Sequence, residues 1–154
     1  MKSWLLRPMP HNIPRMKEFL NQNILAIGWP EITSFSGKSK KDIQNDLSHH
    51  PLNYQPQELG IATSTVNSFV NEMRIGDLVV VPHGNDIFFA KITSDYFYAP
   101  ANVSEGYPHQ RQVEWIKFEY IKLRKDRGLV HKAAVEYIVK HLGSRIPGKD
   151  ENHY

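Results

Sequence analysis

The second half of the chain carries the pattern that most restricts the fold. Residues 77–82 read Asp-Leu-Val-Val-Val-Pro, an apolar β-branched run typical of a buried strand. The sequence at residues 83–86, His-Gly-Asn-Asp, is typical of a turn, because glycine and asparagine adopt unusual backbone angles at little cost. Residues 87–98 form a second long β-like run. The pattern predicts a β-hairpin over residues 77–98, with antiparallel pairing.

The remaining periodic segments surround this hairpin. The predicted strands cover residues 3–7, 24–29, 77–82, 87–98 and 111–123, and the predicted helices begin at Pro14 and Ser39 and cover residues 59–73 and 126–142. Because the strands cluster late and next to one another, the fold class predicted is α+β, a small and mostly antiparallel pseudo-barrel of five to six strands flanked by helices. We expect one domain over residues 1–146 and a flexible tail over residues 147–154.

Several kinds of chemistry are excluded or disfavoured by what the sequence lacks. The chain of 154 residues contains no cysteine, which excludes a disulfide scaffold, a thiolate zinc site and a cysteine nucleophile. There is no glycine-rich phosphate loop and no His-Glu-x-x-His motif, so we expect neither a cofactor nor a metal. No apolar stretch approaches the ~20 residues of a membrane span, and the N-terminus lacks a signal-peptide core. We therefore expect a cytoplasmic protein that does not associate with a membrane.

Charge is unevenly distributed along the chain. Residues 1–108 hold 9 Lys and Arg against 10 Asp and Glu, whereas residues 109–154 hold 10 against 6. A late basic segment on a near-neutral body is compatible with a polyanionic partner, and equally with an ordinary solvated surface. The basic residues in excess over residues 109–154 include the cluster Lys122, Arg124, Lys125 and Arg127.

Three segments, taken in order, resemble a known superfamily. They are Ile24-Leu-Ala-Ile-Gly-Trp29, residues 73–82 with residues 90–98, and His109-Gln-Arg-Gln-Val-Glu-Trp115. This set resembles the PUA-like superfamily, and more closely the EVE- and YTH-like domains that occur alone or fused to methyl-directed restriction enzymes. The resemblance covers residues 3–123. It implies a pseudo-barrel that binds nucleic acid and, in several relatives, a modified base flipped into an aromatic cage.

The aromatic residues near predicted strand ends are the candidates for a base pocket. Trp29 lies between Gly28 and Pro30, which places a large ring at a barrel mouth, either as a pocket wall or as a core plug. The full candidate set is Trp29, Tyr96, Tyr98, Asp95 and Trp115. Tyr96 and Tyr98 share a strand face, and Asp95 offers an acceptor for a base amino group. Trp115 shares a strand face with Val113, a position that is more often part of the core than of a pocket.

Basic residues beside these positions are the candidates for phosphate contacts. Arg111 is the principal one, because a guanidinium matches phosphate oxygens with two hydrogen bonds. An ion pair with Asp77 or Asp95 is the structural alternative for Arg111. The other candidates for the nucleic-acid backbone are His109, Lys38, Lys40 and Lys41.

These residues predict a non-catalytic module that reads a flipped, modified base, with DNA favoured over RNA as the partner. A nuclease or another defence protein would then carry the cutting activity, with the helix over residues 126–142 available for docking. One alternative is an RNA-binding module of the same fold acting on tRNA or rRNA. Another is an enzyme with an ASCH-like barrel that acts on a nucleotide or small amide, using Lys91 or Asp95 as the acid–base group.

Overall fold

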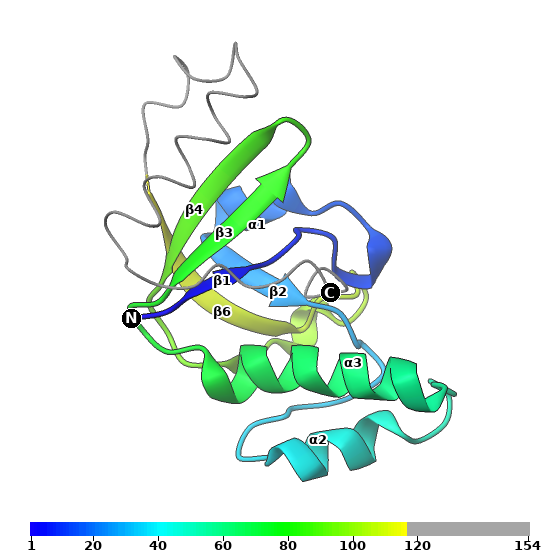
Figure 1. Ribbon diagram of the computed structural model, residues 1–154. Coiled ribbons are helices and arrows are strands. Elements are labelled where there is room, and N and C mark those ends of the chain that lie inside the picture. Colours follow the sequence, from blue (N-terminus) through cyan, green and yellow to red (C-terminus); the bar gives the residue numbers. More distant parts are fainter. Residues whose placement is uncertain (117–154) are drawn as a thin grey trace.

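The computed structural model describes residues 1–116 (Figure 1). The predicted helix over residues 126–142, the predicted tail over residues 147–154 and the end of the strand predicted over residues 111–123 lie outside these residues. So does the basic cluster of Lys122, Arg124, Lys125 and Arg127.

Strands and helices alternate in the first half of the chain, and strands predominate in the second half of the described residues. The strands are β1 (Ser3–Leu5), β2 (Ile24–Ile27), β3 (Leu78–His83), β4 (Asp86–Ile92), β5 (Phe97–Tyr98) and β6 (His109–Ile116). The helices are α1 (Met16–Gln22), α2 (Lys40–Leu47) and α3 (Pro56–Asn67), with a π-helical turn η2 (Ser68–Glu72) continuing α3. Two short 3₁₀ turns, η1 (Pro10–Asn12) and η3 (Pro100–Asn102), lie in the connections.

The described strands form one mixed sheet in the order β1-β3-β4-β6-β2, and β5 also pairs with β6. The β1–β3 pair is parallel and the other pairs are antiparallel. Strand β6 changes neighbours along its length, because its first half pairs with β2 and its second half with β4. The sheet curls into a half-barrel, which confirms the prediction of a small, mostly antiparallel α+β barrel-like fold (Figure 1).

The strand predicted over residues 87–98 is interrupted in the structure. Ile92 pairs with Val113 and Phe97 pairs with Gln110, so residues 93–96 insert two extra residues opposite β6. Such a bulge bends a strand and redirects its side chains. The predicted hairpin itself is confirmed, since β3 pairs with β4 from Leu78 to His83.

Capping chemistry sets where the helices begin. Ser39 and Asp42 form a capping box at the start of α2, as the sequence predicts. Helix α3 begins at Pro56, earlier than the predicted residue 59, because a capping box between Gln55 and Glu58 and a proline in the first turn favour that start. Helices α2 and α3 run alongside each other beneath one end of the sheet (Figure 1).

The buried carboxylate of Asp77 fastens the N-terminal strand to the sheet. Its oxygens accept hydrogen bonds from the Lys2 amide, the Arg74 amide and the Trp4 indole, each at 3.0 Å. Burial alone would raise the pKa of Asp77, but these three donors lower it below its usual value. The carboxylate therefore stays charged and holds β1 beside β3.

We expect Asp77→Ala to lower the free energy of unfolding by about 2–4 kcal/mol, because three donors lose a charged acceptor at once. Urea unfolding followed by tryptophan fluorescence measures this change. The control is Glu114→Ala, which removes an exposed carboxylate from β6. Equal unfolding free energies for the two variants would contradict the role given to Asp77.

Candidate functional site

A cavity of about 240 Å³ lies beside the indole of Trp29, and we call it the Trp29 cavity. Its lining comes from η1, the end of β2 and the connection between α2 and α3. The lining residues are His11, Asn12, Gly28, Trp29, Glu31, Leu52 and Tyr54. The fold therefore brings segments that lie up to about forty positions apart in the sequence to one cavity.

The backbone around the Trp29 cavity is strained. Four non-glycine residues in or between its lining positions have positive φ: His11 at 56°, Asn12 at 61°, Trp29 at 61° and Asn53 at 51°. The other such residue among those described, Asn23, is the ordinary left-handed cap of α1. Strained backbone persists only where the surrounding structure holds it, and it gathers at binding and catalytic sites.

Gly28 permits the close approach of two of these segments. A Cβ atom at Gly28 would lie 3.0 Å from the backbone nitrogen of His11, which is tighter than nine in ten real Cβ contacts. Any side chain at residue 28 would therefore displace His11 and change the shape of the Trp29 cavity.

Trp29 and Tyr54 form the aromatic wall of the cavity. Trp29 is 8% exposed and belongs to the main core, and it also lines the cavity. Its role as the wall of a base pocket stays a prediction. Its Nε1 donates a 2.8 Å hydrogen bond to the Tyr54 hydroxyl. The same pair also lines a second hollow of about 310 Å³ against α3, together with Glu58, Ile61, Ala62 and Thr65.

A third hollow of about 410 Å³ shares Glu31 and Leu52 with the Trp29 cavity. Its other walls include Lys38, Asp46, His49 and His50, so both acidic and basic side chains lie next to the aromatic cavity. We call it the Lys38 hollow.

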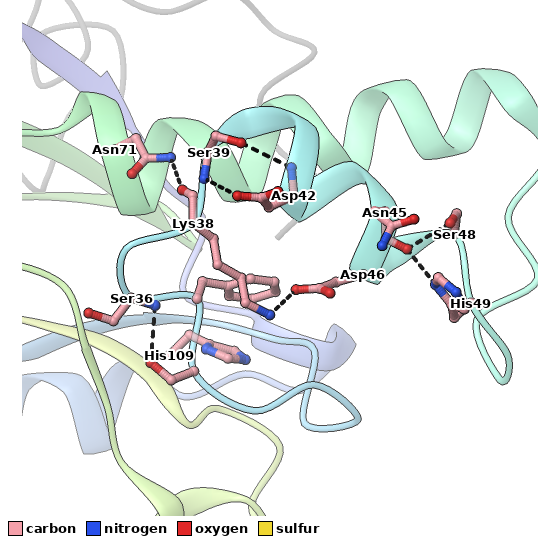
Figure 2. A network of polar contacts seen from close by, with 12 residues as sticks. Ser36, Lys38, Ser39, Asp42, Asn45, Asp46, Ser48, His49, Asn71 and His109 are labelled. Atoms are coloured by element: carbon pink, nitrogen blue, oxygen red, sulfur yellow. Dashed lines mark hydrogen bonds and ion pairs between the residues drawn. The ribbon is translucent and has the colours of Figure 1, made fainter.

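Lys38 and its partners form a polar network in Figure 2. The ammonium of Lys38 forms an ion pair with Asp46. The backbone oxygen of Lys38 accepts a hydrogen bond from the side-chain amide of Asn71. Lys40 and Lys41 lie at the start of α2 and are exposed. Within residues 1–116 neither has an ion-pair partner. They remain candidates for contacts with a nucleic-acid backbone.

The imidazole of His109 is a positioning group, which corrects its assignment to phosphate. It is fully buried, and its Nε2 lies 3.0 Å from the backbone oxygen of Trp29. Because a carbonyl only accepts, Nε2 carries the proton and Nδ1 accepts from the Tyr96 hydroxyl at 2.7 Å. The Tyr96 oxygen in turn accepts from the Phe35 amide at 3.0 Å. His109 therefore fixes the backbone that carries Trp29.

Burial lowers the pKa of His109 from 6.5 to about 4, although the hydrogen bonds to the backbone of Trp29 and Ile32 oppose that shift. The ring is therefore neutral near pH 7, as its hydrogen-bond pattern requires. It packs against three rings, with centroids 4.6 Å from Phe35, 5.9 Å from Tyr96 and 5.4 Å from Tyr98.

The guanidinium of Arg111 also has a structural role in place of the expected phosphate contact. Arg111 is 2% exposed. Its nitrogens donate to the backbone oxygens of Phe69, Val70, Met73 and Ser94 at 2.7–3.2 Å. The first three carbonyls belong to the end of the α3–η2 helix, where backbone acceptors lack helical partners. Burial lowers the pKa of Arg111, while Asp95 and Asp77 oppose this effect through space. No ion pair between Arg111 and either acid occurs within residues 1–116.

The other predicted pocket residues lie away from the Trp29 cavity. Tyr96, Asp95 and Arg111 line a separate open hollow of about 520 Å³ at the end of η2. Tyr98 packs against the ring of His109, with the ring centroids 5.4 Å apart. Trp115 donates from Nε1 to the Phe19 oxygen at 3.2 Å, meets Phe88 edge to face, and packs half-buried against the main core.

Sequence reasoning missed Tyr54, Glu31, His11 and Asn12. Tyr54 and Leu52 lie in a proline-containing connection that reads as an ordinary loop. The one available signal is that two apolar residues, Leu52 and Tyr54, occur in a segment otherwise rich in polar residues and proline. Such residues in a loop are candidates for a site wall, because connections otherwise run over the surface.

Comparison with known proteins gives one match. The family described as "Domain of unknown function (DUF8426)" matches residues 9–133. No curated protein and no solved structure matches the chain. Among residues 1–116, no group of three or more histidine and carboxylate side chains is placed to hold a metal ion. No helix in the same part of the chain has the length and apolar character needed to cross a bilayer.

The neutral, buried state of His109 makes stability depend on pH. The folded pKa lies below the unfolded value of 6.5, so the unfolded chain binds the proton more strongly. The stabilisation is complete above about pH 6.5 and is lost as the pH falls toward 4, at about 1.4 kcal/mol for each unit of pKa difference. Urea unfolding between pH 7 and 4 measures this slope, and His109→Gln is expected to flatten it. Identical slopes for both proteins would contradict this account.

The carbonyl contacts of Arg111 make it a stabilising residue. We expect Arg111→Met to lower the free energy of unfolding by about 3–5 kcal/mol, because buried carbonyls lose their donors. Arg111→Lys is expected to recover only part of this loss, since an ammonium cannot reach four carbonyls in the same geometry. The matched control is Arg74→Met, which changes an exposed arginine in the same hollow and is expected to alter stability by less than about 0.5 kcal/mol. A similar loss in both variants, measured by thermal denaturation, would overturn this role.

Proposed function

The chain belongs to the family described as "Domain of unknown function (DUF8426)", and we propose from its own residues that it is a non-catalytic nucleic-acid-binding module whose Trp29 cavity receives one extruded base. It acts in the cytoplasm on DNA in preference to RNA. The observation that carries the proposal is the convergence of strained backbone, two aromatic side chains and polar side chains on one small cavity.

The size and walls of the Trp29 cavity suit one planar heterocycle. Its volume of about 240 Å³ is below the roughly 300–1,000 Å³ of pockets for drug-sized ligands. A base pulled out of its stack loses a few kcal/mol, which stacking on an aromatic side chain can offset by about 1–3 kcal/mol. Trp29 and Tyr54 supply aromatic surface for that purpose.

The fixed backbone of the cavity supports recognition by shape. Burial of one methyl group contributes only about 0.8 kcal/mol to the binding free energy. A pocket that distinguishes a modified base must therefore be rigid, so that a poorly fitting base cannot be accommodated by a shift of its walls. The strained residues His11, Asn12 and Trp29 and the close approach at Gly28 are features of such a wall. His109 holds the Trp29 carbonyl from behind.

Side chains beside the Trp29 cavity support contacts with the phosphate backbone. The Lys38 hollow adjoins the cavity through Glu31 and Leu52 and carries His49 and His50, whereas the charge of Lys38 is paired with Asp46. A strand whose base occupies the cavity must pass its neighbouring phosphates over the rim, where these side chains lie. Lys40 and Lys41 on α2 add two exposed cations.

The resemblance to the PUA-like superfamily and its EVE- and YTH-like members supports a modified base as the ligand. It also supports a nuclease or another defence protein as the partner. The ASCH-like enzyme alternative receives less support from the geometry. Lys91 is exposed on β4 and lines none of the hollows described above, whereas Asp95 lies in the hollow beside Arg111.

A direct test is the binding of fluorescein-labelled DNA duplexes that hold one unpaired cytosine, 5-methylcytosine, adenine or N6-methyladenine opposite an abasic site. Fluorescence anisotropy at low salt is expected to show binding that weakens steeply as salt is added. Leu52→Trp fills the cavity from its partly exposed rim and is expected to reduce affinity at least tenfold, as is Trp29→Phe. The matched control for Trp29→Phe is Trp115→Phe, outside the cavity.

Lys40→Ala is expected to weaken binding to all these duplexes alike, because a phosphate contact carries no base information. RNA strands with the same unpaired bases test the RNA alternative, which would gain support if they bound more tightly than DNA. Absence of binding to every strand at low salt would refute the proposed function, and so would equal binding by wild type and Leu52→Trp.

A further inference from the structure

We propose that the face of the sheet opposite the main core is a docking surface, and that its occupant is the part of this same chain that follows Ile116. We call this surface the outer face. Its apolar side chains come from β1, β3, β4 and β6, and they are Leu5, Leu78, Val80, Ile87, Phe89 and Ile116. This inference goes beyond the proposed function and does not depend on it.

The alternation of side chains along the strands separates the two faces of the sheet. In β3, Val79 and Val81 belong to the main core, whereas Leu78 and Val80 belong to the second cluster, on the outer face. Strand β4 repeats the pattern, with Phe89 on the outer face between two neighbours that pack in the main core. A strand that is apolar on both faces is typical of a sheet that is buried on both sides.

The described helices bury their apolar side chains in the main core. Their buried residues in that core are Met16, Phe19, Ile43, Leu47, Ala62, Val66 and Phe69. Within residues 1–116 the cluster on the outer face consists of strand residues alone. Even so, Phe89 is 1% exposed and Leu78 is 3% exposed. Side chains that stand on the open face of a sheet remain accessible to water, so these residues require a cover that residues 1–116 do not supply.

The path of the chain favours its own continuation as that cover. Ile116 is the last residue that the structure describes, and it packs in the cluster on the outer face. The following segment is therefore tethered within the surface to be covered. A tethered segment meets its binding surface at an effective concentration on the order of millimolar, which gives it an advantage over any separate molecule.

The sequence after Ile116 has the apolar side chains that such a cover requires. The helix predicted over residues 126–142 has Val130, Ala134, Ile138 and Leu142 at a spacing of four, which places them on one side of a helix. A helix with one apolar side and a sheet with an apolar face are complementary, and packing of one on the other is a common way to bury both.

The outer face lies apart from the Trp29 cavity. Trp29 belongs to the main core, and the lining of its cavity includes none of the residues of the outer face. Docking of the segment after Ile116 would therefore cover the sheet without forming a wall of the cavity.

The test uses a spin label on the full chain, because a protein without cysteine accepts a nitroxide at one introduced thiol. Lys91→Cys places the label on the outer face, since Lys91 is exposed and lies two positions after Phe89 in β4. We expect this label to reduce the amide signals of residues 129–142 at least twofold in the NMR spectrum of isotope-labelled protein. The control is a label at Lys41→Cys on α2, beneath one end of the sheet, which is expected to leave those signals unchanged (Figure 1).

Two further substitutions, each combined with Lys91→Cys, test the apolar side of the predicted helix. Ile138→Asp places a charge among its apolar residues and is expected to abolish the loss of signal. Lys140→Asp is the matched control, because two positions along a helix lead to the opposite side, and it is expected to keep the loss.

Equal loss of signal from the labels at residues 91 and 41, or none from the label at residue 91, would overturn the inference. Persistence of the loss in Ile138→Asp would overturn it as well. A mixture of spin-labelled protein with isotope-labelled protein that has no spin label tests a second copy as the occupant. Signal loss in this mixture would show that another molecule covers the outer face and would overturn the inference, whereas its absence supports the chain's own segment.

Discussion

One face of β6 holds the molecule together through hydrogen bonds from side chains to the backbone of other elements. Residues 109, 111 and 115 share that face, because side chains two positions apart point to the same side of a strand. His109 donates to the carbonyl of Trp29, Arg111 donates to the end of the α3–η2 helix, and Trp115 donates to the carbonyl at the end of α1 that belongs to Phe19. Buried polar groups of this kind are costly unless paired, so each fixes its partner in one position. Strand β6 is thereby attached at three points along its length, two of them in helices and one just after the end of β2.

The strained backbone around the Trp29 cavity depends on this attachment. A non-glycine residue at positive φ costs of the order of 1–3 kcal/mol and would relax if it were free to do so. Trp29 cannot relax, because His109 binds its carbonyl and Tyr54 binds its indole. Gly28 and the backbone of His11 are in close approach directly beside it. The cavity is therefore a consequence of how β6 and η1 hold the end of β2, and it does not need a ligand to give it shape.

The sequence predicted the elements whose signals are local. The β3–β4 hairpin and the capping box of α2 follow from residues close together in the chain, and the structure has both. The roles of His109 and Arg111 could not be derived in this way, because a polar residue on a strand reads as exposed until its neighbours in space are known. Tyr54 escaped notice for the opposite reason, since an aromatic residue in a connection has no periodicity to mark it. Trp29 was identified because Gly28 and Pro30 mark an abrupt strand end, and its double role as core and wall became clear only from the packing.

The acidic side chain beside the cavity and the attraction for phosphate place opposite demands on charge. Glu31 lines the Trp29 cavity, and a carboxylate there repels the phosphates on either side of a bound base over about 10 Å at moderate salt. Residues 1–116, which contain the cavity, carry 10 Lys and Arg against 11 Asp and Glu, whereas residues 117–154 carry 9 against 5. The exposed Lys40 and Lys41 lie on α2 and do not line the Trp29 cavity, so cations outside the cavity supply affinity while the cavity itself discriminates between bases. Base discrimination would then persist at salt concentrations where total affinity has already fallen, because short-range hydrogen bonds inside a cavity are screened far less than contacts with phosphates.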